Sequence, residues 1–295
     1  MSAERIAIVG AGGMLGRELL RSARDRDTEV VSWLTSAELD ITQPDAVMAA
    51  MQDARPDVII NAAAYTDVDG AESSPDDAEA VNHHGPANLA TAARSCGAVL
   101  VHYSTDYVFN GHGTRPYPVD APIEPVNQYG AGKARGEQAV RASGVDHLIL
   151  RTSWLYASHG GNFVRTILRL AVEREVLQVV DDQRGRPTFA ADLARMTLAL
   201  LDAGARGTLH ATNDGECTWF EFAREIVRLA GLSARVEPCD SGAFPRPARR
   251  PAYSVLDLGP LTALIGLPRD WRAALAECVR RIQHDAVTTT GTNRS

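Results

Sequence analysis

Tyr129 and Lys133 are the two side chains whose types and spacing most directly indicate proton chemistry. They lie four residues apart at the start of a predicted helix over 128–142, so both point to one face of it. A phenol with a pKa of about 10 transfers protons poorly at neutral pH unless its surroundings tune it. A lysine ammonium one turn away favours the phenolate and lowers that pKa. The pair alone is a weak signal, because exposed helices also carry it by chance.

A glycine turn far upstream gives the pair a context. The run Gly10-Ala-Gly-Gly13-Met-Leu-Gly16 follows a short apolar strand over 5–9 and opens a helix. Such glycines let the backbone turn sharply and approach a pyrophosphate, which the helix N-terminus then stabilises. This spacing of Gly10, Gly13 and Gly16 is typical of extended short-chain dehydrogenases, and we expect a nicotinamide dinucleotide there.

Small and hydroxyl-bearing residues follow two further predicted strands. Ser104, Thr105 and Asp106 come directly after the strand over 98–102, at the carboxyl edge where such sheets bind ligands. We expect the hydroxyl of Thr105, with Ser104 as second choice, to hydrogen-bond the reacting oxygen and the tyrosine. Asn61 opens a run of alanines after the strand over 57–60, which leaves room for nicotinamide or ribose or is ordinary core packing.

The residues after the second predicted strand, 29–33, bear on the choice of nicotinamide. An NAD site usually places an acid at the end of this strand, on the ribose 2′-hydroxyl. Here the strand ends in Ser-Trp-Leu-Thr-Ser, with neither an acid nor an arginine or lysine. The sequence therefore slightly favours NADPH and leaves NADH open as a second cofactor. Asp40 and Ile41 follow and are placed to hold the adenine edge.

Strand and helix signals alternate over the first 155 residues. Apolar strands are predicted at 5–9, 29–33, 57–60, 98–102 and 147–151, with helices at 14–26, 45–53, 76–96 and 128–142. The helix over 76–96 is expected to be interrupted near Gly85-Pro86. Buried strands separated by helices predict a parallel sheet covered on both faces, which is a Rossmann-type, doubly wound α/β fold.

The second half is less regular and is expected to form a smaller α/β substrate-binding part. Helices are predicted at 162–174, 190–203, 219–230, 258–265 and 271–284, strands at 177–180 and 208–211, and a surface loop over 236–250. We therefore divide the chain into a dinucleotide-binding domain over 1–155, with a later strand returning to its sheet, a substrate-binding part over 156–284, and a disordered tail over 285–295.

Composition narrows the class of protein. The 295 residues carry a formal charge of −7, so no broad basic face for nucleic acid is expected. The four cysteines are widely spaced, as in a cytoplasmic protein with reduced thiols. No apolar run is long enough to span a membrane, and no signal peptide is evident. We expect a cytoplasmic protein with a small-molecule substrate.

Eight motifs together resemble the dTDP-4-dehydrorhamnose reductase family of extended short-chain dehydrogenases. They are GAGGMLG (10–16), NAAAYTDVDGAE (61–72), STDYVF (104–109), YGAGK (129–133), RTSWLY (151–156), NF (162–163), DDQRGRPT (181–188) and PARRP (247–251). The resemblance implies reduction of the C4 ketone of dTDP-4-dehydro-β-L-rhamnose to dTDP-L-rhamnose, using NADPH and often NADH. It covers residues from about 5 to 283.

The resemblance also implies roles for single residues. Tyr129 would protonate the forming C4 alkoxide, Lys133 would bind ribose and tune Tyr129, and Thr105 would complete the catalytic set. The implied cofactor contacts are Gly10, Gly13, Met14, Leu15, Gly16, Asp40, Ile41, Ala64, Tyr65, Thr66, Tyr129 and Lys133. The implied sugar contacts are Thr105, Asp106 and Trp154.

A Pro-rich loop carries three arginines, Arg246, Arg249 and Arg250, whose forked side chains suit the substrate's diphosphate. We assign Arg249 and Arg250 to substrate binding, although a solvated basic loop explains the residues equally well. Arg184 and Arg186 make the DDQRGRPT motif more basic than in many members, and we assign them no role.

Two questions stay open. Some members dimerise through Mg²⁺ held by glutamates; Glu18 matches one of these, but Ala191 stands where those members have glutamate. We therefore assign no metal ligand and expect a monomer or a homodimer. The alternative functions are a sugar-nucleotide epimerase or dehydratase of the same superfamily, and a non-catalytic NADP-binding regulatory subunit.

Overall fold

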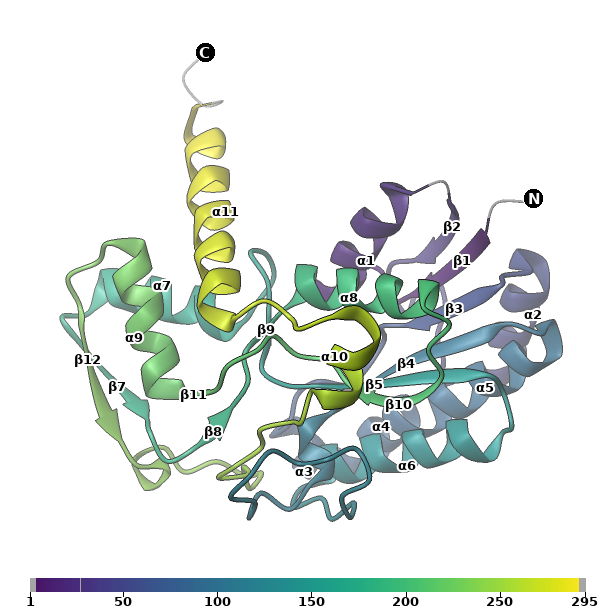
Figure 1. The fold of residues 1–295 in the computed structure, drawn as a ribbon, viewed down its shortest axis with the longest axis horizontal. Helices are drawn as coiled ribbons and strands as arrows, with labels where there is room; N and C mark the ends of the chain where they lie inside the picture. Colours follow the sequence, from purple (N-terminus) through teal and green to yellow (C-terminus); the bar gives the residue numbers. More distant parts are fainter. Residues whose placement is uncertain (1–3, 27, 292–295) are drawn as a thin grey trace.

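The computed structural model describes residues 4–26 and 28–291, and its centre is a parallel sheet of six strands (Figure 1). The strand order is β10-β5-β4-β3-β1-β2, and every neighbouring pair is parallel. The strands are β1 (Glu4–Val9), β2 (Thr28–Trp33), β3 (Val58–Asn61), β4 (Val99–Thr105), β5 (His147–Thr152) and β10 (Gly207–His210). The predicted doubly wound α/β fold is confirmed.

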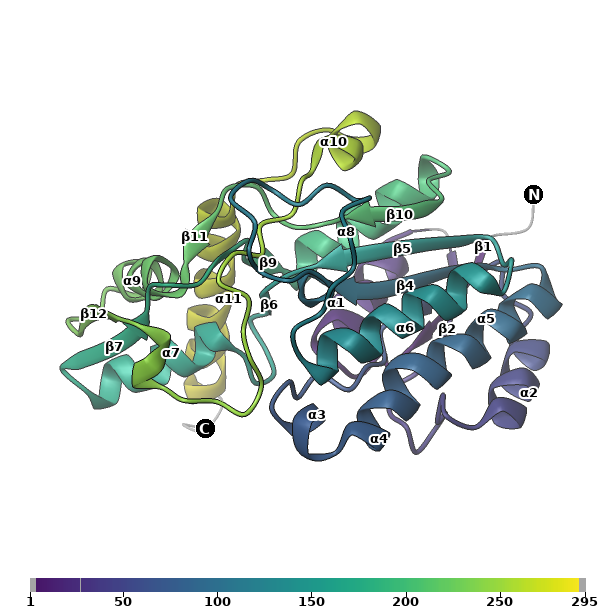
Figure 2. The same ribbon diagram turned by 90° about the horizontal axis from the view of Figure 1, so that it is seen from below.

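Helices cover both faces of this sheet, which is why its strands are apolar on both sides (Figure 2). On one face lie α1 (Met14–Arg24), α8 (Ala190–Asp202) and the short α10 (Gly259–Ile265), packed on one cluster of buried apolar side chains. On the other lie α2 (Pro44–Ala54), α5 (Gly85–Cys96) and α6 (Gln128–Ala142), which share a second cluster.

The order of the strands fixes where a ligand can bind. From β1 the chain moves to β2 on one side and then crosses to β3 on the other side. The carboxyl ends of β1 and β3 therefore diverge into separate loops, and such a switch point is where doubly wound sheets bind ligands. The loops that follow β4 and β5 open at the same edge of the sheet, because all six strands are parallel.

The chain between β3 and α5 differs in detail from its prediction. Instead of one helix over 76–96, it forms α3 (Gly70–Ser73), α4 (Pro75–Glu79) and a π-helical turn η1 (Ala80–His84) before α5. The interruption thus precedes Gly85-Pro86. Pro86 lies in the first turn of α5, directly after the π-helical turn, and has no N–H to donate to that turn.

The C-terminal half builds a second lobe beside the sheet, at the left of Figure 1. Its core lies between α7 (Phe163–Glu173), α9 (Trp219–Ala230) and α11 (Trp271–Gly291). Short paired strands flank these helices: β7 (Val176–Val180) with β12 (Arg235–Cys239), β6 (Leu155–Tyr156) with β9 (Thr188–Phe189), and β8 (Arg184–Gly185) with β11 (Cys217–Thr218).

Two predictions in this half are wrong. The segment over 236–250 is not all loop: β12 pairs with β7, and a 3₁₀ turn η3 (Ser241–Ala243) follows. Pro238 hid this strand from the sequence, but β12 is an edge strand, where proline is tolerated. The tail expected to be disordered from 285 is helical to Gly291, because an established helix extends at little cost; residues 292–295 lie outside the described residues.

Within the described ranges, no helix is both long and apolar enough to cross a membrane.

Candidate active site

The glycine turn after β1 has the geometry that a dinucleotide requires. Gly10 has a positive φ of 75°, and a Cβ atom on it would lie 2.6 Å from the backbone nitrogen of Ala63. A Cβ atom on Gly16 would lie 2.2 Å from the carbonyl oxygen of Gly10. Gly13, in contrast, is exposed, and a Cβ atom there would meet only that carbonyl oxygen, at 3.4 Å. Two glycines therefore hold the turn closed, and the third leaves its outer side open.

The N-terminus of α1 completes this open side. The helix begins at Met14, and its first turn carries no acidic residue. The backbone N–H groups of Met14 and Leu15 belong to this turn, in which helices have no internal acceptor. The turn and the helix dipole together suit a pyrophosphate. The predicted contacts Gly10, Gly13, Met14, Leu15 and Gly16 thus lie around one place.

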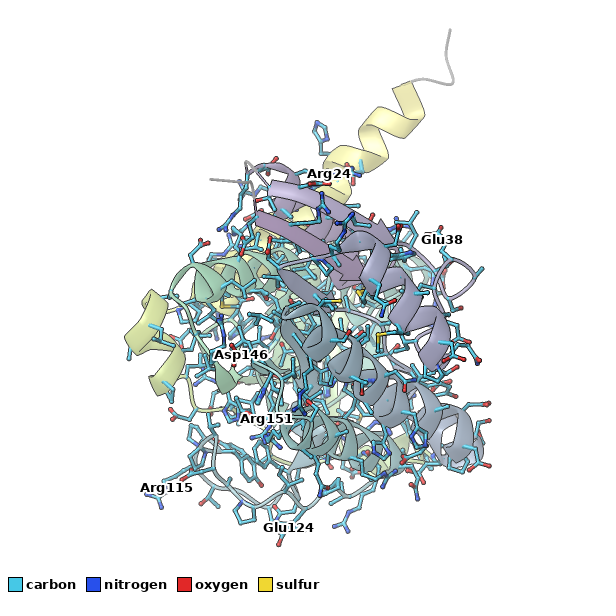
Figure 3. All side chains as sticks on the ribbon, turned by 90° about the vertical axis from the view of Figure 1, so that its right-hand side faces the viewer. Arg24, Glu38, Arg115, Glu124, Asp146 and Arg151 are labelled. Atoms are coloured by element: carbon cyan, nitrogen blue, oxygen red, sulfur yellow. The ribbon has the colours of Figure 1, made fainter. Side chains whose placement is uncertain are left out.

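The loop after β2 contains an acid that the sequence reading missed. Leu34 accepts a hydrogen bond from Gly12 N at 3.0 Å, and its own N–H donates to Glu38 Oε2 at 2.7 Å. The carboxylate of Glu38 is thereby folded back to the end of β2, at the surface in Figure 3. Arg17 lies on the other side of this loop, where its Nε donates to Gly12 O at 2.9 Å. An acid and a cation therefore both border the glycine turn. The expectation that the end of β2 has neither is wrong.

Asp40 and Ile41 are held by contacts within the protein. Asp40 Oδ1 accepts hydrogen bonds from the backbone N–H and the hydroxyl of Thr42, at 2.9 and 2.8 Å. The carbonyl of Ile41 accepts from Asn88 Nδ2 at 2.9 Å, and its side chain packs where a Cβ atom on Gly85 would stand. The loop beyond β2 is therefore fixed by α5.

Two asparagines shape the loop after β3, which carries Ala64, Tyr65 and Thr66. Asn61 Oδ1 accepts a hydrogen bond from Ala63 N at 3.1 Å. Asn82, buried in the π-helical turn, accepts from Tyr65 N at 3.0 Å and donates to Tyr65 O at 2.9 Å. Sequence reasoning anticipated Asn61 but not Asn82, since nothing local indicates that a residue 17 positions away holds this loop.

The start of α6 brings the catalytic candidates together. Asn127 caps the helix by accepting a hydrogen bond from Gly130 N at 2.8 Å. A Cβ atom on Gly130 would lie 2.1 Å from the carbonyl oxygen of Tyr107, so α6 is pressed against the 3₁₀ turn η2 (Asp106–Val108) that follows β4. The rings of Tyr107 and Tyr129 meet edge to face, 5.9 Å apart. Tyr129 is thereby placed beside the end of β4.

A hydrogen-bonded chain runs from Tyr129 into the end of β4. The hydroxyl of Thr105 donates to Asp106 Oδ1 at 3.0 Å, and Thr105 also acts on the phenol of Tyr129, whose pKa it lowers. Asp106 is buried, and its Oδ2 makes no hydrogen bond of ordinary geometry among the described residues. Burial raises the pKa of Asp106 to about 7, although the Ser254 hydroxyl moderates the rise. The structure thus brings together Thr105, Asp106 and Tyr129, as predicted.

The pKa of Tyr129 moves in the direction opposite to the sequence-based expectation. Burial and the charge of Asp106 raise it to about 12, and the hydrogen bond with Thr105 is what opposes the rise. The expected lowering by Lys133 is therefore wrong for this structure, because withdrawal from water outweighs a charge one turn away. The phenol stays protonated at neutral pH, as a proton donor must.

Lys133 is buried and stands over a layer of charged side chains. Burial lowers its pKa to about 8, and Glu137, one turn further along α6, partly opposes this. Glu137 in turn accepts two hydrogen bonds of 2.8 Å from Arg151 of β5, which lies inside the domain in Figure 3. Burial alone would raise the pKa of Glu137, but these bonds bring it below its usual value. The Glu137–Arg151 pair fixes α6 to the sheet.

Trp154 has a left-handed backbone conformation, and its ring stacks on another tryptophan. Its φ is +47°, a region that large side chains rarely adopt. Its half-buried ring stacks on Trp219 of α9 with centroids 3.6 Å apart, and a Cβ atom on Gly185 would lie 2.6 Å from it. Such a strained residue persists only where its surroundings hold it. The ring is thus held in one position against the second lobe.

The arginine-rich loop is not free in solvent. Arg250 donates to both oxygens of Asp69, at 3.1 and 3.0 Å, and Arg246 donates to the same carboxylate at 3.2 Å. The side chain of Arg249 is exposed, while its carbonyl accepts from Asn127 Nδ2 at 2.8 Å. The loop therefore rests against the catalytic helix and the β3–α3 loop. Asp69 was absent from the predicted set.

Two other groups of charged residues have partners within the chain. Arg186 pairs with Asp214 at 2.7 Å, and Arg184 lies 3.6 Å from both Glu216 and Glu221. These contacts stay within the second lobe and serve its packing.

Glu18 is buried and faces basic side chains of its own chain. Its carboxylate lies 3.1 Å from His159, 3.4 Å from Arg281 and 3.8 Å from Arg21. Ala191 is buried and offers no ligand atom. Among the described residues, the one cluster with metal-ligand spacing is Glu79, His83 and His84, in which Arg135 is ion-paired with Glu79.

Comparisons with known proteins agree with this geometry. Residues 4–284 match the model of the family described as RmlD substrate binding domain. The chain is 48% identical over 281 residues to the dTDP-4-dehydrorhamnose reductase of Streptomyces griseus, covering 92% of each chain. The crystal structure of a dTDP-4-dehydrorhamnose reductase from Clostridium acetobutylicum has a TM-score of 0.92 at 42% identity, covering 95% of this chain and 99% of that one. That from Bacillus anthracis, in complex with NADP, has a TM-score of 0.90 at 39% identity, covering 96% and 99%.

Proposed function

Because the chain belongs to the dTDP-4-dehydrorhamnose reductase family, we propose that it reduces the C4 ketone of dTDP-4-dehydro-β-L-rhamnose to dTDP-L-rhamnose with NAD(P)H. The observation that carries the proposal is the protonated phenol of Tyr129. Thr105 opposes the rise in the pKa of this phenol, at the sheet edge that also bears the open glycine turn.

The residues around the phenol have separable tasks. When bound, a dihydronicotinamide would supply a hydride to C4 of the sugar, and the resulting alkoxide would need one proton. Tyr129 gives that proton, while Thr105 holds the phenol and the reacting oxygen in line. The pKa of Lys133 is about 8, so most of this residue is charged at pH 7 and stabilises the phenolate that remains. Lys133 also holds the ribose hydroxyls.

For the cofactor, we propose NADPH with NADH also accepted. The glycine turn and the N-terminus of α1 hold the pyrophosphate, and the loops carrying Asp40–Ile41 and Ala64–Thr66 hold adenine and the nicotinamide ribose. Arg17 supplies positive charge for a 2′-phosphate, whereas Glu38 suits an unmodified ribose. The B. anthracis relative, which is in complex with NADP, supports this choice.

For the substrate, Trp154 provides an apolar wall for the deoxysugar and Asp106 a hydrogen-bond partner for its hydroxyls. Arg249 and Arg250 face the diphosphate.

We further propose that catalysis needs no Mg²⁺, in a monomer or a homodimer. The carboxylate of Glu18 already faces Arg281 and Arg21 and hydrogen-bonds His159, so a divalent ion there would have to displace the arginines.

The test is oxidation of NADPH by the purified protein, with and without dTDP-4-dehydrorhamnose, in parallel with NADH. Oxidation that requires the sugar nucleotide supports the reductase. Turnover of a sugar nucleotide without net oxidation would identify an epimerase or dehydratase instead. Binding of NADP without any turnover would identify a regulatory subunit.

A further inference from the structure

The carboxylate of Asp69 accepts four hydrogen bonds from the arginine-rich loop. Its carboxylate accepts from Arg246, from both terminal nitrogens of Arg250, and from the backbone N–H of Ala248 at 3.1 Å. These donors lie 177 to 181 positions further along the chain. Burial works against the ionised form, but the N–H donors bring the pKa of Asp69 below its usual value, so Asp69 is a carboxylate at neutral pH.

The same loop has a second attachment, to the catalytic helix. Asn127 caps α6 with its Oδ1 atom and donates its Nδ2 to the carbonyl of Arg249. Ala248, whose N–H takes part in the attachment to Asp69, is buried. The backbone of 246–250 is therefore held from two sides, by the β3–α3 loop and by the N-terminus of α6. The side chain of Arg249 is the part that stays exposed.

This arrangement lies in the active site. Both Arg250 and Asp69 act electrostatically on the phenol of Tyr107, whose ring contacts that of Tyr129. Three arginines within five residues would repel one another and adopt many rotamers if nothing held them. One carboxylate that engages two of the three reduces this repulsion and fixes the direction of those two. Arg246 uses one of its five N–H donors in this contact, so donors stay available for an anion.

We propose that Asp69 is the positioning residue for the substrate's diphosphate. By clamping Arg246 and Arg250, it holds the arginine-rich loop in the conformation in which all three guanidinium groups meet the two phosphates. This rests on the proposed function, because it takes the diphosphate of a sugar nucleotide as the ligand of the loop.

The test compares Asp69→Asn with Asp67→Asn. Asp67 is an exposed carboxylate in the same loop, and it accepts a hydrogen bond from Gly70 N that an asparagine oxygen preserves. For Asp69→Asn we expect KM for the sugar nucleotide and Kd for dTDP to rise roughly tenfold, which corresponds to about 1.4 kcal/mol. We expect kcat and the KM for NADPH to stay within about twofold. Asp67→Asn should leave all four constants unchanged.

Asp69→Glu provides a second variant that keeps the charge. It should recover most of the dTDP affinity, because the longer carboxylate still reaches the two arginines. A loss as large as that of the asparagine variant would overturn the proposal. So would equal constants for Asp69→Asn and Asp67→Asn, or a parallel loss of kcat and NADPH binding, which indicates general disruption. A wild-type protein that binds dTDP but does not reduce the ketosugar would instead refute the proposed function alone.

Discussion

Replacement of Asp106 should stabilise the folded protein at neutral and higher pH while lowering its activity. Its carboxyl group is buried with one oxygen lacking an ordinary hydrogen bond, and burial raises its pKa from 3.8 to about 7. A rise of about 3 units corresponds to roughly 4 kcal/mol against the ionised form, at 1.36 kcal/mol per unit. Asp106→Asn keeps the shape of the side chain and removes this titration.

The sign of the effect follows from proton binding. Between pH 4 and pH 7, as marked by the two pKa values, the folded protein holds the proton on Asp106 more tightly than the unfolded chain does. The wild-type protein therefore loses stability as pH rises through this window, and loses no more above it. The asparagine variant has no such loss. Its free energy of unfolding, relative to wild type, should increase between pH 4 and pH 8 by up to about 4 kcal/mol.

Urea unfolding at pH 5 and pH 8 measures this difference, with Asp69→Asn as control. The pKa of Asp69 is lowered in the fold, so that carboxylate contributes stability at pH 8 that disappears in acid. Because this loss occurs only below the usual pKa of 3.8, the difference in unfolding free energy between Asp69→Asn and wild type should stay constant from pH 5 to pH 8, whereas that of Asp106→Asn should grow. If the advantage of Asp106→Asn fails to grow between pH 5 and pH 8, the reasoning about its burial is refuted. The activity of Asp106→Asn should nevertheless fall, because Asp106 is proposed to hydrogen-bond the hydroxyls of the sugar.

Three further predictions concern the cofactor and metals. Glu38→Gln removes the carboxylate at the end of β2. The variant should therefore favour NADPH, and the ratio of its kcat/KM for NADPH to its kcat/KM for NADH should rise several-fold. An unchanged ratio would mean that the 2′-phosphate or 2′-hydroxyl of the cofactor binds elsewhere. Lys133→Ala should weaken NADPH binding and lower kcat, each by roughly tenfold. If neither changes, the proposal that Lys133 binds the ribose and stabilises the phenolate is refuted. Incubation with EDTA should leave activity unchanged, as measured by NADPH oxidation, and a loss reversed by Mg²⁺ would contradict the account of Glu18.

Much of the sheet and of the catalytic set could be predicted, because their signals are local. A strand, a glycine turn and a helix start within 16 residues identified the dinucleotide turn, and the six parallel strands follow from apolar runs separated by helices. The positions of Thr105 and Tyr129 were found the same way, from a strand end and a helix start.

The missed residues act over long separations or through tertiary folding. Asp69 meets its arginines across more than 170 positions, and Asn82 holds a loop from inside a π-helical turn. Glu38 lies beyond the strand that it caps, so inspection of the strand end alone overlooked it. The raised pKa of Tyr129 was missed for a different reason: spacing shows which charge is near, but burial sets the larger effect.

The measurement that tests the central claim most directly is the turnover of Tyr129→Phe alongside its affinity for NADPH. The account predicts that kcat for dTDP-4-dehydrorhamnose falls by about 10²–10⁴, the usual contribution of a positioned proton donor, while the Kd for NADPH stays within about twofold. Near-normal turnover, with the cofactor bound as in the wild type, would contradict the assignment of Tyr129 as the acid.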